Sequence, residues 1–152
     1  MGKKYLFLSE EEGRAMVTWL KQLVDTNDFA MPLANREEFI PAELLEYNGT
    51  EKDLVFSIIN NTPKGFSFIL ETRYSRKILC MLHTHARHRN RDGNLINSPH
   101  LHVYEENEST YDAIYFGDYL KDTEKIGSGL IAFLKYCAVN NINDLSIEED
   151  LL

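Results

Sequence analysis

The sequence predicts an α+β domain in which one helix at each end of the chain packs on an antiparallel, meander-like sheet of four to six strands. Three observations support this fold class. An apolar stripe with helical spacing lies near each end of the chain, and short runs rich in Val, Ile, Phe, Tyr and Thr lie between them. The 152 residues, 43% of them hydrophobic, contain neither a repeat nor a linker. We therefore expect a single domain over residues 1–152.

The first helix is expected over residues 10–25. Ser9 precedes three glutamates in a capping-box pattern, in which Ser9 accepts from a backbone N–H and Glu12 reaches back to the Ser9 N–H. The residues that follow form one apolar stripe, made of Met16, Trp19, Leu20, Leu23 and Val24. We expect this stripe, including Trp19, to lie in the core.

From about residue 36 onward, short β-prone runs alternate with turn sequences. The strands expected from these runs are 53–59, 66–74, 77–87, 100–105 and 111–119. Turn residues fill 60–65 and 75–76, which indicates consecutive hairpins. A polar loop over 89–94 contains Asp92-Gly93, a pair typical of chain reversal.

The last helix is expected to have Thr123 as its N-cap and to stop near Asn140-Asn141. Its apolar stripe consists of Ile126, Leu130, Phe133, Leu134 and Cys137. Cys80 and Cys137 both lie in apolar runs, so we expect reduced, buried thiols. The acidic run 148–150 is expected to be a solvated tail.

No apolar run reaches the ~18 residues of a membrane span, and the N-terminus lacks the apolar core of a signal peptide. We expect a soluble cytoplasmic protein that does not bind membranes. The overall net charge of -8 disfavours nonspecific binding to duplex nucleic acid. However, residues 73–104 hold 6 Lys/Arg and 1 Asp/Glu, so a basic segment with room for a phosphate group lies inside an acidic chain.

All five histidines lie in this basic segment, in His83-Thr84-His85 followed by His88, and in His100-Leu101-His102. Side chains two apart on a strand point to the same face, so each His-x-His presents two neighbouring imidazoles. Imidazole titrates near neutral pH and is also the commonest ligand of zinc. The cluster is therefore the candidate site, through acid/base chemistry or through a metal.

Two chemical interpretations of the cluster remain open, beside a structural one. In the first, which needs no cofactor, His88 and His102 act as acid and base on a phosphate ester, and the site also includes His100, Asn90 and Asp92. Its phosphate-binding residues are Arg87, Arg89 and Arg91. In the second, a divalent metal such as zinc is bound by His83, His85, His100 and His102. In the structural interpretation, the histidines are half-exposed sheet residues beside a surface that binds a partner.

These motifs also carry a resemblance to an uncharacterised family of small bacterial and phage proteins. The shared features are His88-x-Asn90-x-Asp92-Gly93, with Arg91 where the family has Pro, followed by Pro99-His100-Leu101-His102-Val103-Tyr104. The family's first helix is similar to Leu20-Lys21-Gln22-Leu23-Val24-Asp25, and its last to Phe133-Leu134-Lys135-Tyr136-Cys137. The resemblance implies no established activity.

Two more distant resemblances rest on shorter patterns. The Pro-His-Leu-His strand after a polar turn is similar to TumE-like toxins of bacterial toxin–antitoxin pairs, which implies toxin-like action on RNA. His100-Leu101-His102-Val103-Tyr104 resembles part of the signature of histidine-triad nucleotide-binding proteins, with Tyr104 replacing the third histidine; this resemblance implies a nucleophilic His102.

We therefore expect a toxin-like protein that acts on RNA, a nucleotide or another phosphate ester and has an antitoxin or other protein partner. The alternative is a non-enzymatic binding protein, such as a phage counter-defence factor or an antitoxin-like partner. In that case the acidic segments 1–72 and 105–152 mimic nucleic acid toward a basic surface.

Overall fold

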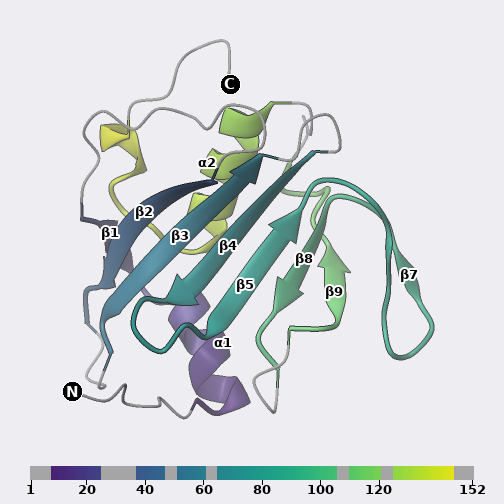
Figure 1. Cartoon of the computed structure of the whole chain (residues 1–152), viewed down its shortest axis with the longest axis horizontal. Helices are drawn as coiled ribbons and strands as arrows, with labels where there is room; N and C mark the ends of the chain where they lie inside the picture. Colours follow the sequence, from purple (N-terminus) through teal and green to yellow (C-terminus); the bar gives the residue numbers. More distant parts are fainter. Residues whose placement is uncertain are drawn as a thin grey trace.

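The computed structural model describes residues 8–24, 37–46, 51–60, 65–105, 110–120 and 125–145. Within these ranges two helices and nine strands are present (Figure 1). The helices are α1 (Glu10–Thr18) and α2 (Ile126–Tyr136), followed by a 3-10 turn (Ile142–Asp144). The strands are β1 (Lys21–Leu23), β2 (Glu37–Leu44), β3 (Asp53–Asn60), β4 (Phe66–Thr72), β5 (Ile78–His83), β6 (His88–Arg89), β7 (Leu95–Ile96), β8 (His100–Val103) and β9 (Ala113–Tyr115).

In the described ranges, seven strands form one antiparallel sheet in the order β1-β2-β3-β4-β5-β8-β9. Strands β6 and β7 form a separate hairpin between β5 and β8 (Figure 1). The α+β class and the antiparallel sheet are confirmed, but the strand number exceeds the predicted four to six. The reason is that β1, β6 and β7 are only two or three residues long, too short for an alternating pattern to be visible in the sequence.

The predicted first helix, 10–25, is wrong at its C-terminal end. The helix stops at Thr18, and Lys21–Leu23 instead pairs with β2 at the edge of the sheet. The apolar stripe splits accordingly: Met16 and Leu23 are buried, while Trp19, Leu20 and Val24 are 40%, 47% and 61% exposed. Placing Trp19 in the core was therefore also wrong, because the chain leaves the helix direction directly after Thr18.

The helix ends are determined by local contacts. The predicted N-cap is confirmed, since the Glu12 backbone N–H donates to Ser9 Oγ over 3.1 Å. The Glu12 carboxylate, however, accepts from the Ser9 hydroxyl rather than from its N–H. The start of α2 follows Lys125, and the predicted cap Thr123 lies outside the described residues. This helix ends at Tyr136, before the predicted stop at 140–141, and Ala138 then adopts a left-handed φ of 59°.

Both helices lie behind the sheet in the view of Figure 1, and the core fills the space between them. Phe133 of α2 packs between Phe56 and Phe68, with ring centroids 6.0 Å from each. Cys80 and Cys137 are buried free thiols, as predicted. The acidic run 148–150 lies outside the described residues. In the part of the chain that the structure describes, no helix is long and apolar enough to cross a membrane.

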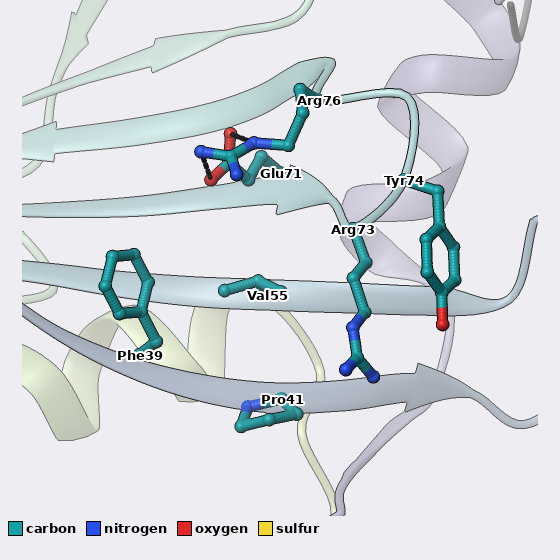
Figure 2. Close-up of a pocket in the computed structure, with 7 residues that line it drawn as sticks. All are labelled: Phe39, Pro41, Val55, Glu71, Arg73, Tyr74 and Arg76. Atoms are coloured by element: carbon teal, nitrogen blue, oxygen red, sulfur yellow. Dashed lines mark hydrogen bonds and ion pairs between the residues drawn. The ribbon is translucent and has the colours of Figure 1, made fainter. Parts of the chain in front are cut away.

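No helix of the described ranges covers the opposite face of the sheet in Figure 1, and we call it the open face. Directly paired residues of neighbouring strands point to the same face of the sheet. The strand register therefore shows which residues form a row across the strands on the open face. One row joins Phe39, Ser57, Ile69, Met81 and His102, and another joins Ile59, Ser67, His83, His100 and Tyr115. A cavity lined by residues of β2, β3, β4 and the β4–β5 turn lies on the open face (Figure 2), and the histidines lie at its β5–β8 end.

Candidate metal centre

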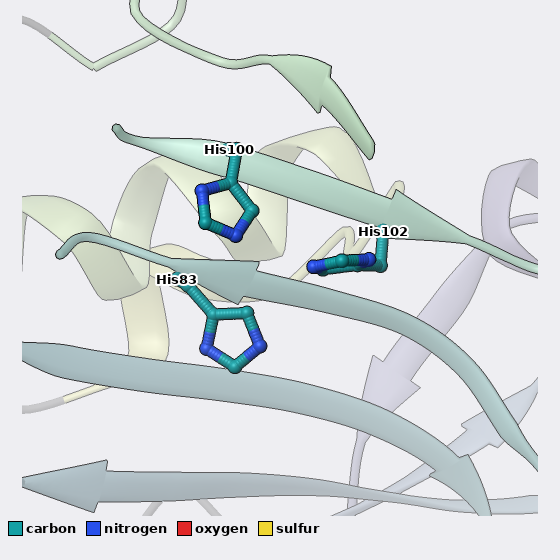
Figure 3. Close-up of side chains that lie close together, drawn as sticks. All are labelled: His83, His100 and His102. Carbon is teal, nitrogen blue, oxygen red and sulfur yellow. The ribbon is translucent and has the colours of Figure 1, made fainter. Parts of the chain in front are cut away.

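Three histidines meet where β5 ends and β8 begins. His83 is directly paired with His100, and alternation along β8 brings His102 to the same face (Figure 3). One ring nitrogen from each of the three lies within 4.8 Å of the other two. Such atoms lie within about 2.8 Å of a common centre, so a shift below about 1 Å brings each to the ~2.0–2.1 Å of a Zn–N bond. We call His83, His100 and His102 the trio.

Two of the trio's imidazoles are oriented by hydrogen bonds. His83 Nδ1 and Ser67 Oγ are 2.9 Å apart, and Ser67 is the residue paired with His83 in the sheet. His102 Nδ1 lies 2.9 Å from the carbonyl oxygen of Tyr111, which requires a proton on Nδ1 and leaves the lone pair on Nε2. Metal-binding histidines are typically held in this way, through the ring nitrogen that does not bind the metal.

The segment that joins β5 to β6, with the first residue of β6, brings the remaining two histidines near the trio. The His88 ring centroid lies 4.6 Å from that of His102 and 5.7 Å from that of His100. His85 lies farther out, with its ring centroid 6.0 Å from that of His83. Between His85 and His88, Ala86 adopts a left-handed φ of 64°, so the chain bends there. All five histidines therefore belong to one cluster, although His85 lies outside the trio.

Three ring nitrogens of the cluster are buried without a hydrogen-bond partner, namely His85 Nδ1, His88 Nε2 and His100 Nδ1. Across the described ranges, every buried side-chain nitrogen or oxygen in this condition belongs to a histidine of the cluster. A buried polar atom without a partner costs about 1–3 kcal/mol of stability. Such a concentration of unused bonding capacity at one place indicates a site that binds something.

The environment of the trio favours the uncharged imidazole. Burial lowers the pKa of His83 and of His100 to about 4, and repulsion between the neighbouring imidazoles, chiefly from His102, acts in the same direction. Burial and repulsion from His88 also lower the pKa of His102, although hydrogen bonds to the backbone around Tyr111 oppose the shift. At neutral pH the three rings are uncharged and each offers a lone pair.

Asn90 and Asp92, the polar residues predicted to join the site, form hydrogen bonds that hold the β6–β7 hairpin. The Asn90 amide donates to the Ala113 carbonyl and accepts from the Ala113 N–H, both over 2.8 Å, and so joins the hairpin to β9. Asp92 is exposed and accepts from the Asn94 N–H and side-chain amide within the hairpin turn. These contacts fix the position of the β6–β7 hairpin over the trio.

The three predicted phosphate-binding arginines differ from one another. Arg91 pairs with Glu105 over 3.0 Å, and its guanidinium lies 5.0 Å from the Tyr111 ring centroid. Arg89 donates from Nη1 to the Gly93 carbonyl, and both Arg87 and Arg89 are exposed. Arg87 and Arg89 are thus exposed cationic residues that flank His88 in the chain.

The sequence did not single out Ser67 or the Tyr111 carbonyl as orienting groups. The sequence does contain a signal for Ser67, which is a polar residue between Phe66 and Phe68 near the start of β4, on the face opposite Phe68. No signal in the sequence reports the Tyr111 carbonyl, because its role depends on how β9 approaches β8.

Comparison with known proteins gives one match. A family model described as a family of unknown function (DUF6978) matches residues 8–139, which include every histidine of the cluster. The predicted resemblance to an uncharacterised family is thereby confirmed. No curated protein and no solved structure matches the chain.

Proposed function

The chain belongs to the family of unknown function DUF6978, which supplies no activity, and from its own residues we propose that it is a divalent-metal protein with the trio as its metal centre. One observation carries the proposal: three uncharged imidazoles, from two directly paired strands, with ring nitrogens within 4.8 Å of one another. Imidazole-only donors suit zinc and other borderline metals. Three protein ligands are typical of catalytic centres, because the fourth position stays open to water or substrate.

The chemistry that a metal supplies at such a centre is an activated water molecule at neutral pH. Arg87 and Arg89, exposed on the adjacent hairpin, support an anionic substrate, and a phosphate ester fits best. In its hydrolysis, the water oxygen bonds to phosphorus, the bond from phosphorus to the leaving oxygen breaks, and a water proton ends on the leaving group. His88, whose Nε2 is buried and unpartnered next to His102, is placed to carry that proton.

Acid/base catalysis without a metal fits these surroundings less well. That mechanism needs one imidazole protonated near neutral pH. In the predicted pair of His88 and His102, burial and repulsion from His88 lower the pKa of His102. Burial also lowers the pKa of His83 and of His100 to about 4, and the neutral imidazole is the form that binds metals. Within the proposal, the expected toxin-like action on RNA takes the form of metal-assisted phosphodiester hydrolysis.

The first experiment measures metal binding directly. Untagged protein is stripped with a chelator and titrated with Zn²⁺ by calorimetry. We expect one ion per chain, and a loss of affinity above about 100-fold in each of His83→Ala, His100→Ala and His102→Ala. The matched control is His85→Ala, which removes a clustered imidazole outside the trio and retains wild-type affinity. No binding by the wild type, or equal affinity in the trio variants and the control, would overturn the proposal.

A second experiment tests the reaction. Zinc-loaded and metal-free protein are incubated with an activated phosphodiester and with RNA, and products are followed by absorbance and by gel. We expect turnover only with the loaded protein, and none with loaded His88→Ala if that residue carries the proton. In parallel, induced wild type is expected to arrest bacterial growth and degrade RNA, whereas His102→Ala, folded by circular dichroism, does neither.

A further inference from the structure

The second feature of the open face is a cavity of about 400 Å³, lined by Phe39, Pro41, Val55, Glu71, Arg73, Tyr74 and Arg76 (Figure 2). Its floor is apolar sheet surface, formed by Val55 and Pro41. Figure 2 shows the Arg73 side chain extending over β3 toward Pro41, with Tyr74 beside it. None of these residues carried a functional prediction from the sequence.

The cavity presents exposed aromatic rings next to a cation. Phe39 is 54% exposed and Tyr74 is 60% exposed, although both are large apolar side chains. The Arg73 guanidinium lies 5.4 Å from the Tyr74 ring centroid and forms no ion pair with any described carboxylate. By contrast, Arg76 pairs with Glu71 over 3.2 Å. Among the described residues that line the cavity, Arg73 is therefore the cation without an ion-pair partner.

The turn that carries Arg73 and Tyr74 is held in place before any ligand binds. The buried Glu51 carboxylate accepts from the Tyr74 N–H over 2.6 Å and from the Ser75 hydroxyl over 2.7 Å. A second contact joins the Arg73 N–H to the Asp53 carbonyl over 3.1 Å. A preformed turn binds a ligand without first losing conformational entropy, so these contacts favour a binding role for its side chains.

The cavity and the trio lie on the same face of the sheet. Phe39 of the cavity and His102 of the trio belong to one row of paired residues, with Ser57, Ile69 and Met81 between them. Four spacings of ~4.8 Å between neighbouring strands separate them, a distance of about 19 Å. The trio end of the face also carries exposed aromatic rings: Tyr115, paired with His100, is 50% exposed, and Tyr111, whose ring contacts His88, is 48% exposed.

We propose that a single-stranded nucleic acid binds across the open face, with a base stacked at Phe39 and Tyr74, a phosphate at Arg73 and the scissile phosphodiester at the trio. This inference rests on the proposed function, since the trio supplies the reaction. Exposed aromatic rings and a few cations, spaced along a strip, are the usual components of single-strand binding. The few cations and the acidic chain as a whole disfavour a duplex, which requires a broad basic surface.

The test uses the metal-free full-length chain, so that binding is measured without hydrolysis. Fluorescence anisotropy follows labelled single strands of about eight nucleotides, one of RNA and one of DNA, and the duplex of the same sequence. We expect both Arg73→Gln and Tyr74→Ala to weaken single-strand binding about tenfold, and Tyr74→Phe to retain it. The matched control Lys135→Gln removes an exposed cation from α2, on the covered face, and leaves affinity unchanged.

The outcomes separate this inference from the proposed function. Unchanged affinity in Arg73→Gln and Tyr74→Ala, tighter binding of the duplex, or no binding of either single strand would overturn it, even if the trio binds zinc. Single-strand binding that depends on Arg73 and Tyr74 would support it even if calorimetry detects no metal, and the proposed function alone would then fail. The affinity ratio of the two single strands identifies RNA or DNA as the preferred substrate.

Discussion

The two faces of the sheet treat buried polar groups in opposite ways. On the covered face, the fully buried Lys21 ammonium donates three hydrogen bonds, to the carbonyls of Val17, Trp19 and Cys137, over 2.6, 2.8 and 2.7 Å. An ammonium has three N–H donors, and all of them are used. On the open face, buried imidazoles keep ring nitrogens without partners. The difference is that the Lys21 donors on the first face all have partners, whereas the second face keeps ring nitrogens that the proposed metal would use.

The largest effect is expected from removing the Lys21 hydrogen bonds on the covered face. Lys21→Met keeps the length of the side chain but leaves three carbonyls without their donor, so we expect the free energy of unfolding to fall by about 3 kcal/mol. Urea denaturation measures it. Lys135→Met, at an exposed position of α2, is the control and should change stability by less than about 0.5 kcal/mol. A loss at Lys21 as small as that of the control would contradict the distinction between the faces.

The next largest effect is expected from adding Zn²⁺ to the trio on the open face. Under the proposed function, zinc binds the folded chain through the trio, so a free concentration 100 times the Kd should add about 2.7 kcal/mol to the free energy of unfolding. Denaturation with Zn²⁺ and with a chelator measures the difference. His100→Ala should show no such gain, and a gain of the same size in that variant would place the metal elsewhere.

Acid should lower the free energy of unfolding of the metal-free protein through the histidines of the open face. The pKa of His83 and His100 is about 4 when folded and about 6.5 when unfolded, so the unfolded chain binds more protons between these values. Stability is therefore complete above about pH 6.5 and falls toward pH 4, by on the order of 1 kcal/mol for each histidine after allowance for partial solvent access. The unfolding free energy of His100→Gln, measured across this pH range, should depend less on pH than that of the wild type. A pH dependence as steep as that of the wild type would exclude His100 as a cause.

The smallest effect concerns an orienting group. Ser67→Ala removes the hydroxyl beside His83 Nδ1 but no ligand, so the affinity for Zn²⁺ should fall about tenfold while one ion still binds. Calorimetry measures both quantities. Ser57→Ala, at a buried serine of the same face outside the trio, is the matched control and should leave the affinity unchanged. Equal affinity in both variants would show that Ser67 does not orient the ligand.

The sequence predicts those features that local spacing determines. The His-x-His spacing identified His100 and His102 as imidazoles on one face of β8, and Ser9 identified the start of α1. The same prediction was wrong for His83 and His85, because β5 ends at His83. Features that depend on distant strands were not predictable. The pairing of His83 with His100 requires β5 and β8 to be neighbours, although a hairpin separates them in the chain. The contact of Asn90 with Ala113 of β9 likewise cannot be inferred from its neighbours in the chain.

The dependence on distant strands also explains why the end of α1 was predicted wrongly and why the cavity was not predicted. Trp19 and Leu20 continue a helical stripe, yet the pairing of Lys21–Leu23 with β2 takes precedence over that periodicity. In the sequence, Arg73 and Tyr74 are indistinguishable from ordinary turn residues. Only the pairing of β2 with β3 shows that Phe39 and Val55 line a cavity beside them.

The β6–β7 hairpin leaves the sheet after His83 and returns to it at His100, two residues that are directly paired. An insertion whose two ends meet is a natural module, since its length and composition can change without altering the strands on either side. Evolution can therefore vary Arg87, Arg89 and His88 while the trio remains unchanged in the sheet. Transplanting the hairpins of other family members onto this sheet would reveal whether substrate choice is inherited separately from the metal centre.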